Sequence, residues 1–108
     1  MGTARQNRGR RTNQVVAQWL REHGHPDAVA TFGSEPGRDI KNVEFSAIEV
    51  KARRDFRPLE WLRQASKNAG VDCPCVIMRC DGQGEQSVGD YLVIRRLRED
   101  ELNRGGPE

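Results

Sequence analysis

Residues 45–52 have the sequence FSAIEVKA. Its β-branched residues Ile48 and Val50 favour extended backbone, so the stretch predicts a strand. Successive side chains of a strand point to opposite faces, which places Glu49 and Lys51 together on one face. Ile48 and Val50 then point to the other face. The stretch therefore predicts a strand with one apolar face and two opposite charges on the other.

Upstream of this strand, short extended segments alternate with turns. Residues 39–40 predict a second strand, joined to the first by a turn at residues 41–44, so we expect a hairpin. A partly β-branched stretch at residues 28–32 predicts another short strand, and the turn-forming run GSEPG at residues 33–37 separates it from the hairpin.

Two amphipathic helices are predicted, one before and one after these strands in the sequence. The first covers residues 12–23, with Thr12 or Asn13 as its cap and Gly24 as its end. Its apolar residues recur at helical spacing and are Val15, Val16, Trp19 and Leu20. The second helix begins at Pro58 and runs to Ala69, and its apolar stripe comprises Leu59, Leu62, Ala65 and Ala69. We expect Trp19 and Trp61 to pack in the core or in a dimer interface, because isolated tryptophans on apolar faces usually bury area.

The carboxyl-terminal part of the chain contains two apolar runs, at residues 75–78 and 91–94, separated by a turn at residues 81–84. Such runs are typical of strands that are covered on both faces. A short helix is also expected within residues 95–102. The predicted fold class is α/β, with the element order α-β-β-β-α-β-β.

The length of 108 residues is that of one compact domain, which we place at residues 12–102. Residues 1–11 are expected to form a flexible basic arm, since they contain Arg5, Arg8, Arg10 and Arg11 and no acid, and residues 103–108 a flexible tail. The formal net charge of +2 does not by itself indicate a nucleic-acid binder, so the local distribution of charge is more informative.

The three cysteines, Cys73, Cys75 and Cys80, form an odd and closely spaced set. We expect buried strand cysteines, because a zinc site normally needs four ligands and a secreted disulfide framework needs an even number of cysteines. No apolar run approaches the roughly 20 residues of a membrane-spanning helix, so we expect no membrane association and a cytoplasmic location, in the host cytoplasm if the protein is phage-encoded.

Asp39, Glu49 and Lys51 are the residues that suggest chemistry. Hydrolysis of a phosphodiester needs an activated water and positive charge on the phosphate oxygens, both of which a Mg²⁺ ion held by carboxylates supplies. Asp39, Glu49 and the backbone carbonyl of Val50 are suitable oxygen ligands. Lys51 could orient the water and stabilise the charge that develops on the phosphate. A Glu-x-Lys sequence alone is usually a solvated charge pair, so its context decides.

That context resembles a known family. The runs GRDI at residues 37–40, AIEVKA at 47–52 and PLEWLRQA at 58–65 look like the PD-(D/E)XK nuclease superfamily, and look closest to small Holliday-junction-resolvase-like proteins of archaea and bacteriophages. The resemblance spans about residues 10–97. It implies a restriction-endonuclease-like core with a central mixed β-sheet flanked by helices, and a homodimer. It also implies dependence on Mg²⁺, for which Mn²⁺ can substitute, and cleavage of branched or four-way-junction DNA.

By motif position, Asp39 and Glu49 would be metal ligands, Lys51 the catalytic lysine, and Gln64 a helix residue that helps to organise the site. The sequence departs from the family at Arg38, where the motif has proline. It also has Asn13 and Gln14 where archaeal resolvases place a glutamate near the start of the first helix. An amide carries no charge to bind a second metal, so one-metal chemistry is expected.

Basic residues around the motif are candidates for DNA contacts. A loop with Arg53, Arg54 and Arg57 directly follows the motif strand, although a loop that merely aids solubility is the alternative. The other predicted DNA contacts are Arg10, Arg11, Asn13 and Arg38. The sequence thus predicts a structure-selective DNA endonuclease. The alternatives are a non-catalytic nucleic-acid-binding module that retains the nuclease fold, or a restriction-type or repair-type nuclease.

Overall fold

Strand β3 (Ser46–Ala52) lies at the centre of a five-stranded sheet with the order β1-β2-β3-β4-β5. A computed structural model describes residues 4–31 and 37–102, with side chains from Gly9 onward. Strand β3 pairs antiparallel with β2 (Ile40–Lys41) and parallel with β4 (Cys73–Arg79). The outer strands, β1 (Val29–Ala30) and β5 (Leu92–Ile94), pair antiparallel with β2 and β4. The sheet is therefore mixed, as predicted.

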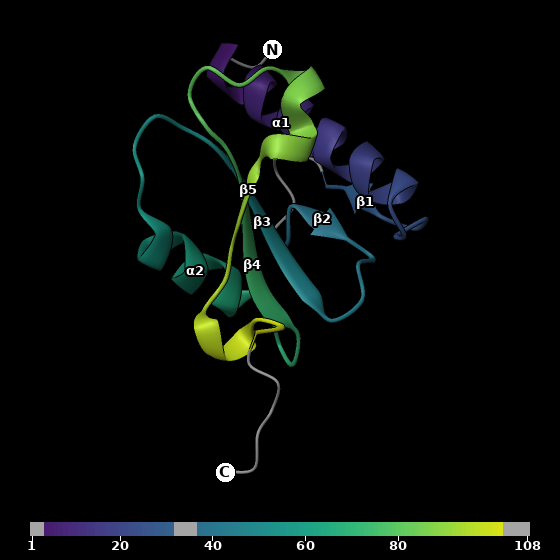
Figure 1. Cartoon of the computed structure of the whole chain (residues 1–108), viewed down its shortest axis with the longest axis vertical. Coiled ribbons are helices and arrows are strands. Elements are labelled where there is room, and N and C mark those ends of the chain that lie inside the picture. Colours follow the sequence, from purple (N-terminus) through teal and green to yellow (C-terminus); the bar gives the residue numbers. More distant parts are fainter. Residues whose placement is uncertain (1–3, 32–36, 103–108) are drawn as a thin grey trace.

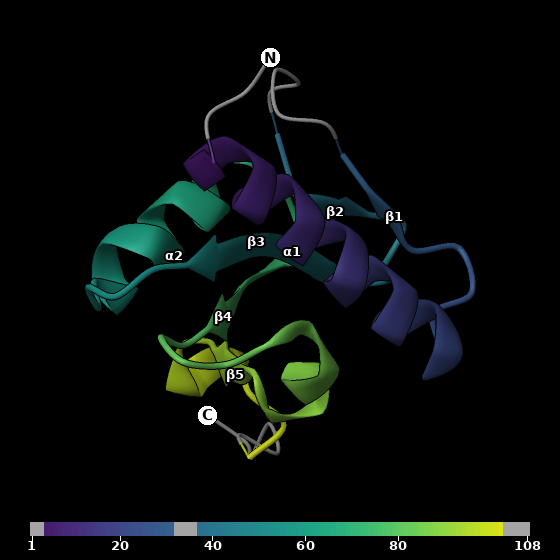
Figure 2. The ribbon, with the colours of Figure 1, turned by 90° about the horizontal axis from the view of Figure 1, so that it is seen from above.

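Two helices cover opposite faces of this sheet. Helix α1 (Ala4–Glu22) packs on β1 and β3, and α2 (Pro58–Lys67) packs on β3 and β4 from the other side (Figures 1 and 2). Helix α2 is also the crossover that a parallel β3–β4 pair requires, because no tight turn can join parallel strands. The predicted order of helices and strands is confirmed in the described residues.

The alternation of side chains along β3 and β4 divides the core into two parts. On the α1 face, the buried residues include Val16, Ala17, Leu20, Ile40, Ile48, Cys75 and Ile77. On the α2 face, they are Trp61, Leu62, Val76 and Met78. Trp61 is 2% exposed, so its predicted packing role is confirmed. The polar face of β3, with Glu49 and Lys51, is consequently the face on which α2 lies.

Strand β5 differs from its prediction. Its apolar sequence predicts burial on both faces, yet Leu92 is 47% exposed and Val93 is 57% exposed. The reason is the position of β5 at the edge of the sheet, where, among the described residues, it pairs with β4 alone. Strand β4, by contrast, has an interior position, and its residues from Pro74 to Met78 are buried.

Helix α1 begins at Ala4, eight residues before the predicted start at residue 12, so it covers most of the segment that is expected to form the basic arm. Thr12 is therefore not the cap at the start of the helix but lies within it. Its side chain is fully buried, and its hydroxyl accepts a hydrogen bond from Arg79 Nη1 at 3.1 Å. Arginine, glutamine and alanine are good helix formers, which allows the helix to extend through this polar segment.

Two short 3-10 helices complete the structure. Helix η1 (Glu85–Asp90), which the sequence does not predict, packs against α1, and η2 (Leu97–Glu99) lies within the short helix expected at residues 95–102 (Figure 1). The predicted strand at residues 28–32 is shorter, since β1 covers Val29–Ala30. Its last residue, most of the predicted loop at 33–37 and the predicted tail at 103–108 lie outside the described residues. Within the described part of the chain, no helix has the length and apolar character needed to cross a bilayer.

Candidate metal centre

Asp39 lies immediately before β2, and its backbone is bound on both sides. Its N–H donates to the carbonyl of Ile48 on β3 at 3.0 Å, and its carbonyl accepts from the N–H of Thr31 at 2.9 Å. The Thr31 hydroxyl, which lies in a residue 8% exposed, donates to the carbonyl of Arg38 at 2.9 Å. Asp39 is thus fixed between β3 and the segment that follows β1.

The side chain of Asp39 points along β3 toward the Glu-Val-Lys sequence. Its Oδ2 atom accepts a hydrogen bond from the N–H of Val50 at 2.8 Å. The N–H and C=O of a strand residue point toward the same neighbouring strand, so the carbonyl of Val50 also points toward the Asp39 side. The carboxylate of Asp39 and the carbonyl oxygen of Val50 therefore lie on the same side of β3.

Glu49 and Lys51 form a mostly buried ion pair on the α2 face of β3. The Lys51 Nζ atom lies 3.5 Å from Glu49 Oε2, and the two side chains are 12% and 16% exposed. Ile48 packs in the core on the other face, and Val50 packs against that core. The shared face of Glu49 and Lys51 is thus present as the alternation along residues 45–52 predicts.

The charges of this cluster are not balanced. Burial raises the pKa of Asp39, although the hydrogen bond from Val50 and the charge of Lys51 lower it. Burial also raises the pKa of Glu49, and the nearby charge of Asp39 raises it further, whereas Lys51 lowers it. Two carboxylates therefore share one ammonium, and a divalent cation would relieve the remaining repulsion.

The donor set fits Mg²⁺, which prefers oxygen ligands and retains several waters. Among residues 4–31 and 37–102, no group of three or more His, Cys, Asp or Glu side chains is placed to hold a metal. The oxygen atoms that would hold such an ion are those of Asp39, Glu49 and the carbonyl of Val50. This number of ligands is compatible with a single hydrated Mg²⁺ and offers no second carboxylate pair.

Gln64 lies on α2, with an exposed side chain, and its carbonyl accepts a long hydrogen bond from Asn68 Nδ2 at 3.5 Å. Its side chain forms no hydrogen bond with Asp39, Glu49 or Lys51 among the described residues. Its role in the site stays a prediction that rests on the resemblance.

The three arginines after β3 differ in their partners. Arg53 is exposed and has no ion-pair partner within the described part of the chain. Arg54 pairs with Asp81 at 3.3 Å and is 86% exposed. Arg57 pairs with Asp55 at 3.1 Å and is 63% exposed. Exposed ion pairs contribute little free energy, so a phosphate could replace these carboxylates at small cost.

The remaining predicted DNA contacts are dispersed. Arg10 and Arg11 are exposed on α1, where Arg11 pairs with Glu85 of η1 at 3.1 Å, and Asn13 is half-buried on the same helix. Arg38 is turned toward the protein itself, where it forms an ion pair with Asp72 at 2.8 Å. The structure therefore places Arg53, Arg54 and Arg57 at the end of the motif strand and the others elsewhere.

Sequence reasoning missed Thr31 as a support of the Asp39 backbone. Its signal is weak, because a lone threonine after a short strand is common, and its hydrogen-bond acceptors on Arg38 and Asp39 lie seven and eight residues further along the chain. It also missed Asp72, whose ion pair with Arg38 joins positions 34 residues apart. Neither partner can be identified from one sequence without the fold.

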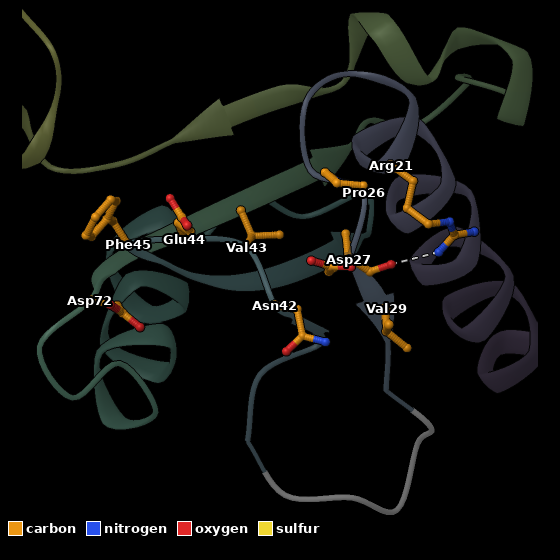
Figure 3. Close-up of a pocket in the computed structure, with 10 residues that line it drawn as sticks. Arg21, Pro26, Asp27, Val29, Asn42, Val43, Glu44, Phe45 and Asp72 are labelled. Atoms are coloured by element: carbon orange, nitrogen blue, oxygen red, sulfur yellow. Dashed lines mark hydrogen bonds between the residues drawn. The ribbon is translucent and has the colours of Figure 1, made fainter.

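A separate concavity lies at the other end of β3 (Figure 3). Its volume is about 700 Å³, and its lining includes Asp27, Glu44, Phe45 and Asp72 but none of Asp39, Glu49 and Lys51. The guanidinium of Arg21, at its rim, donates to the carbonyl of Ala28 at 2.8 Å. Three carboxylates around an open hollow disfavour binding of a phosphate there.

The five-stranded mixed sheet with a helix on each face defines an α/β domain. Comparisons with known proteins found no matching family model, no matching curated protein and no matching solved structure. A functional assignment consequently depends on the geometry of the site and on the motif resemblance.

Proposed function

We propose that this protein is a Mg²⁺-dependent, structure-selective DNA endonuclease of the PD-(D/E)XK kind that cleaves Holliday junctions or other branched DNA. One observation carries the proposal. The Asp39 carboxylate accepts a hydrogen bond of 2.8 Å from Val50, the residue between Glu49 and Lys51, whose side chains form an ion pair of 3.5 Å, so that two carboxylates lie near one ammonium. A solvated surface charge pair, which is the alternative for a Glu-x-Lys sequence, would be exposed.

The roles of the residues follow from their positions. Asp39, Glu49 and the carbonyl of Val50 would hold the cation, which supplies positive charge to the phosphate and lowers the pKa of a bound water. Mn²⁺ is expected to substitute, because it accepts the same oxygen ligands. The Lys51 ammonium donates to the attacking water and to a non-bridging phosphate oxygen, where it stabilises the charge of the transition state. Gln64 is proposed to orient this water from α2.

The fold is compatible with a restriction-endonuclease-like core, because the motif strand β3 lies between an antiparallel β2 and a parallel β4 reached through a helix. We further propose that the protein acts as a homodimer, so that two sites face two strands of a junction. The exposed Leu92 and Val93 on the unpaired edge of β5 are compatible with burial in such an assembly.

The test is a cleavage assay on a four-way junction, a flap and a linear duplex, each with Mg²⁺, Mn²⁺ or Ca²⁺. We expect nicks near the branch point with Mg²⁺ and Mn²⁺, and binding without cleavage with Ca²⁺. Lys51→Ala should lower the cleavage rate by about 100-fold or more, as the loss of one transition-state donor does in other enzymes. Lys67→Ala is a matched control, because Lys67 is an exposed lysine on α2 without an ion-pair partner among the described residues.

The second candidate is a nucleic-acid-binding module without turnover. Its support is twofold. The half-buried Asn13 on α1 stands where archaeal resolvases have an acidic residue, and among the described residues the site has no third carboxylate. Junction binding without nicks in both Mg²⁺ and Mn²⁺ would establish this module and refute the enzyme. Equal cleavage of linear duplex and junction would instead indicate a restriction-type or repair-type nuclease.

A further inference from the structure

Each nitrogen of the Arg38 guanidinium has an acceptor within the protein. Its Nε donates to the carbonyl of Asn68 at 2.9 Å, and its Nη2 donates to the carbonyl of Ala69 at 2.8 Å. Its Nη1 lies 2.8 Å from Asp72 Oδ2 and donates to the carbonyl of Ser46 at 3.4 Å. All three nitrogens have acceptors, and the side chain is 26% exposed.

These acceptors belong to three different segments. Asn68 and Ala69 follow the end of α2, Asp72 precedes β4, and Ser46 is the first residue of β3. The carbonyls after a helix lack partners within it and carry the negative end of its dipole, so a cation with several donors is favoured there. Arginine suits this place better than lysine, because its planar fork reaches several acceptors at once.

The backbone of Arg38 continues directly into Asp39. Thr31 holds the Arg38 carbonyl, and Ile48 accepts the Asp39 N–H, so a shift of Arg38 must move the Asp39 backbone. The Asp39 carboxylate, in turn, reaches the Val50 N–H at 2.8 Å. The side chain of Arg38 thus connects the position of this carboxylate to α2 and to the start of β3.

We propose that Arg38 is a positioning residue of the metal site, which holds the Asp39 carboxylate in place by joining residue 38 to the end of α2, and is not a contact to DNA phosphate. Its catalytic consequence rests on the proposed nuclease function, whereas its structural consequence does not. Arg53 is the contrasting residue, since it is exposed and has no ion-pair partner in the described part of the chain.

The test compares Arg38→Lys with Asp72→Asn and Arg53→Ala. Arg38→Lys keeps the charge near the helix end but cannot reach all the acceptors, and Asp72→Asn removes only the ion pair. The first readout is hydrogen exchange of the Val50 amide in the metal-free protein, followed by NMR, because that amide donates to Asp39. The other readouts are the Mg²⁺ concentration for half-maximal cleavage and the Kd for junction DNA in Ca²⁺.

We expect Arg38→Lys to speed exchange of the Val50 amide and to raise the half-saturating Mg²⁺ concentration, each by about 10-fold, the lower end of the range for residues that support metal ligands. Its Kd for DNA should change by less than about 2-fold, which is below half a kcal/mol. Asp72→Asn should also speed exchange of the Val50 amide and raise the half-saturating Mg²⁺ concentration, but by less than Arg38→Lys. Arg53→Ala should weaken DNA binding and leave exchange of the Val50 amide unchanged.

Unchanged exchange of the Val50 amide in a folded Arg38→Lys protein would overturn the proposal. A higher Kd for junction DNA as the main effect of this substitution would overturn it as well. If Arg38→Lys does not fold, Asp72→Asn decides by the same two readouts. Absence of cleavage by the unaltered protein would refute the proposed nuclease function. The exchange measurement would still show whether Arg38 positions Asp39.

Discussion

The ion pair between Lys51 and Glu49 makes the stability of the protein sensitive to a single substitution, Lys51→Met. The two charged atoms lie 3.5 Å apart, and the side chains are 12% and 16% exposed. At that distance the attraction is about 5 kcal/mol for an effective dielectric constant of about 20, and desolvation of both charges offsets part of it. Removal of one partner from a buried pair costs about 3–5 kcal/mol, because the other charge is left without compensation. We expect Lys51→Met to lower the free energy of unfolding by about 3 kcal/mol near pH 7.5. This is the lower end of the range, because a carboxylate that loses its partner can bind a proton.

The loss should depend on pH. The pKa values of Asp39 and Glu49 are raised in the folded protein, mainly by burial. A carboxyl group with a raised pKa binds its proton more tightly in the folded state, so its contribution to stability is present at low pH and is lost as the pH rises through the folded pKa. Without Lys51 both pKa values rise further. The deficit of Lys51→Met should therefore be small near pH 4.5 and grow toward pH 7.5.

The measurement is urea denaturation of the metal-free protein at both pH values, followed by tryptophan fluorescence. Trp61 is 2% exposed in the native state and reports unfolding directly. The double variant Lys51→Met with Glu49→Gln is the matched control, because it removes both charges of the pair and should recover most of the lost stability. An equal loss at the two pH values, or no recovery in the double variant, would show that the charge of Lys51 does not compensate the carboxylates.

Three further predictions concern the site and the core. Asp39→Asn should stabilise the metal-free protein by about 1 kcal/mol near pH 7.5, because it removes a buried like charge yet keeps the acceptor for the Val50 N–H. It should also abolish the rise in Tm that Mg²⁺ produces, and calorimetry with and without Mg²⁺ measures both effects. Trp61→Ala should lower the free energy of unfolding by about 3–5 kcal/mol, measured in urea, and a loss below about 1 kcal/mol would mean that the α2 face is not packed as described. Arg53→Ala should reduce the salt dependence of DNA binding by about one unit of slope, measured by titration at several KCl concentrations, and an unchanged slope would exclude a phosphate contact.

The candidate site could be predicted in part from the sequence. The alternation along residues 45–52 was sufficient to place Glu49 and Lys51 on one face, because alternation is a local property of extended backbone. The short spacing to Asp39 made a hairpin neighbour plausible, and the structure has β2 beside β3. Arg38 could not be interpreted in this way. Its acceptors Asn68 and Ala69 lie 30 and 31 residues away in sequence, so only the folded chain shows that its charge is used internally.

Local periodicity and the turn residues between segments were sufficient to predict, from the sequence by itself, the order of α1, α2 and the five strands and the shared face of Glu49 and Lys51. They did not predict that Leu59 of the α2 stripe is 65% exposed. The tertiary structure alone decided that β5 is an exposed edge, since the order of strands in a sheet depends on long-range pairing. It also decided that α1 continues back to Ala4, because burial of Thr12 beside Arg79 replaces the cap that a threonine at that place suggests. The balance of charge around Asp39, Glu49 and Lys51 likewise depends on the tertiary structure. A sequence specifies which groups can ionise, but burial and distance set what each charge costs.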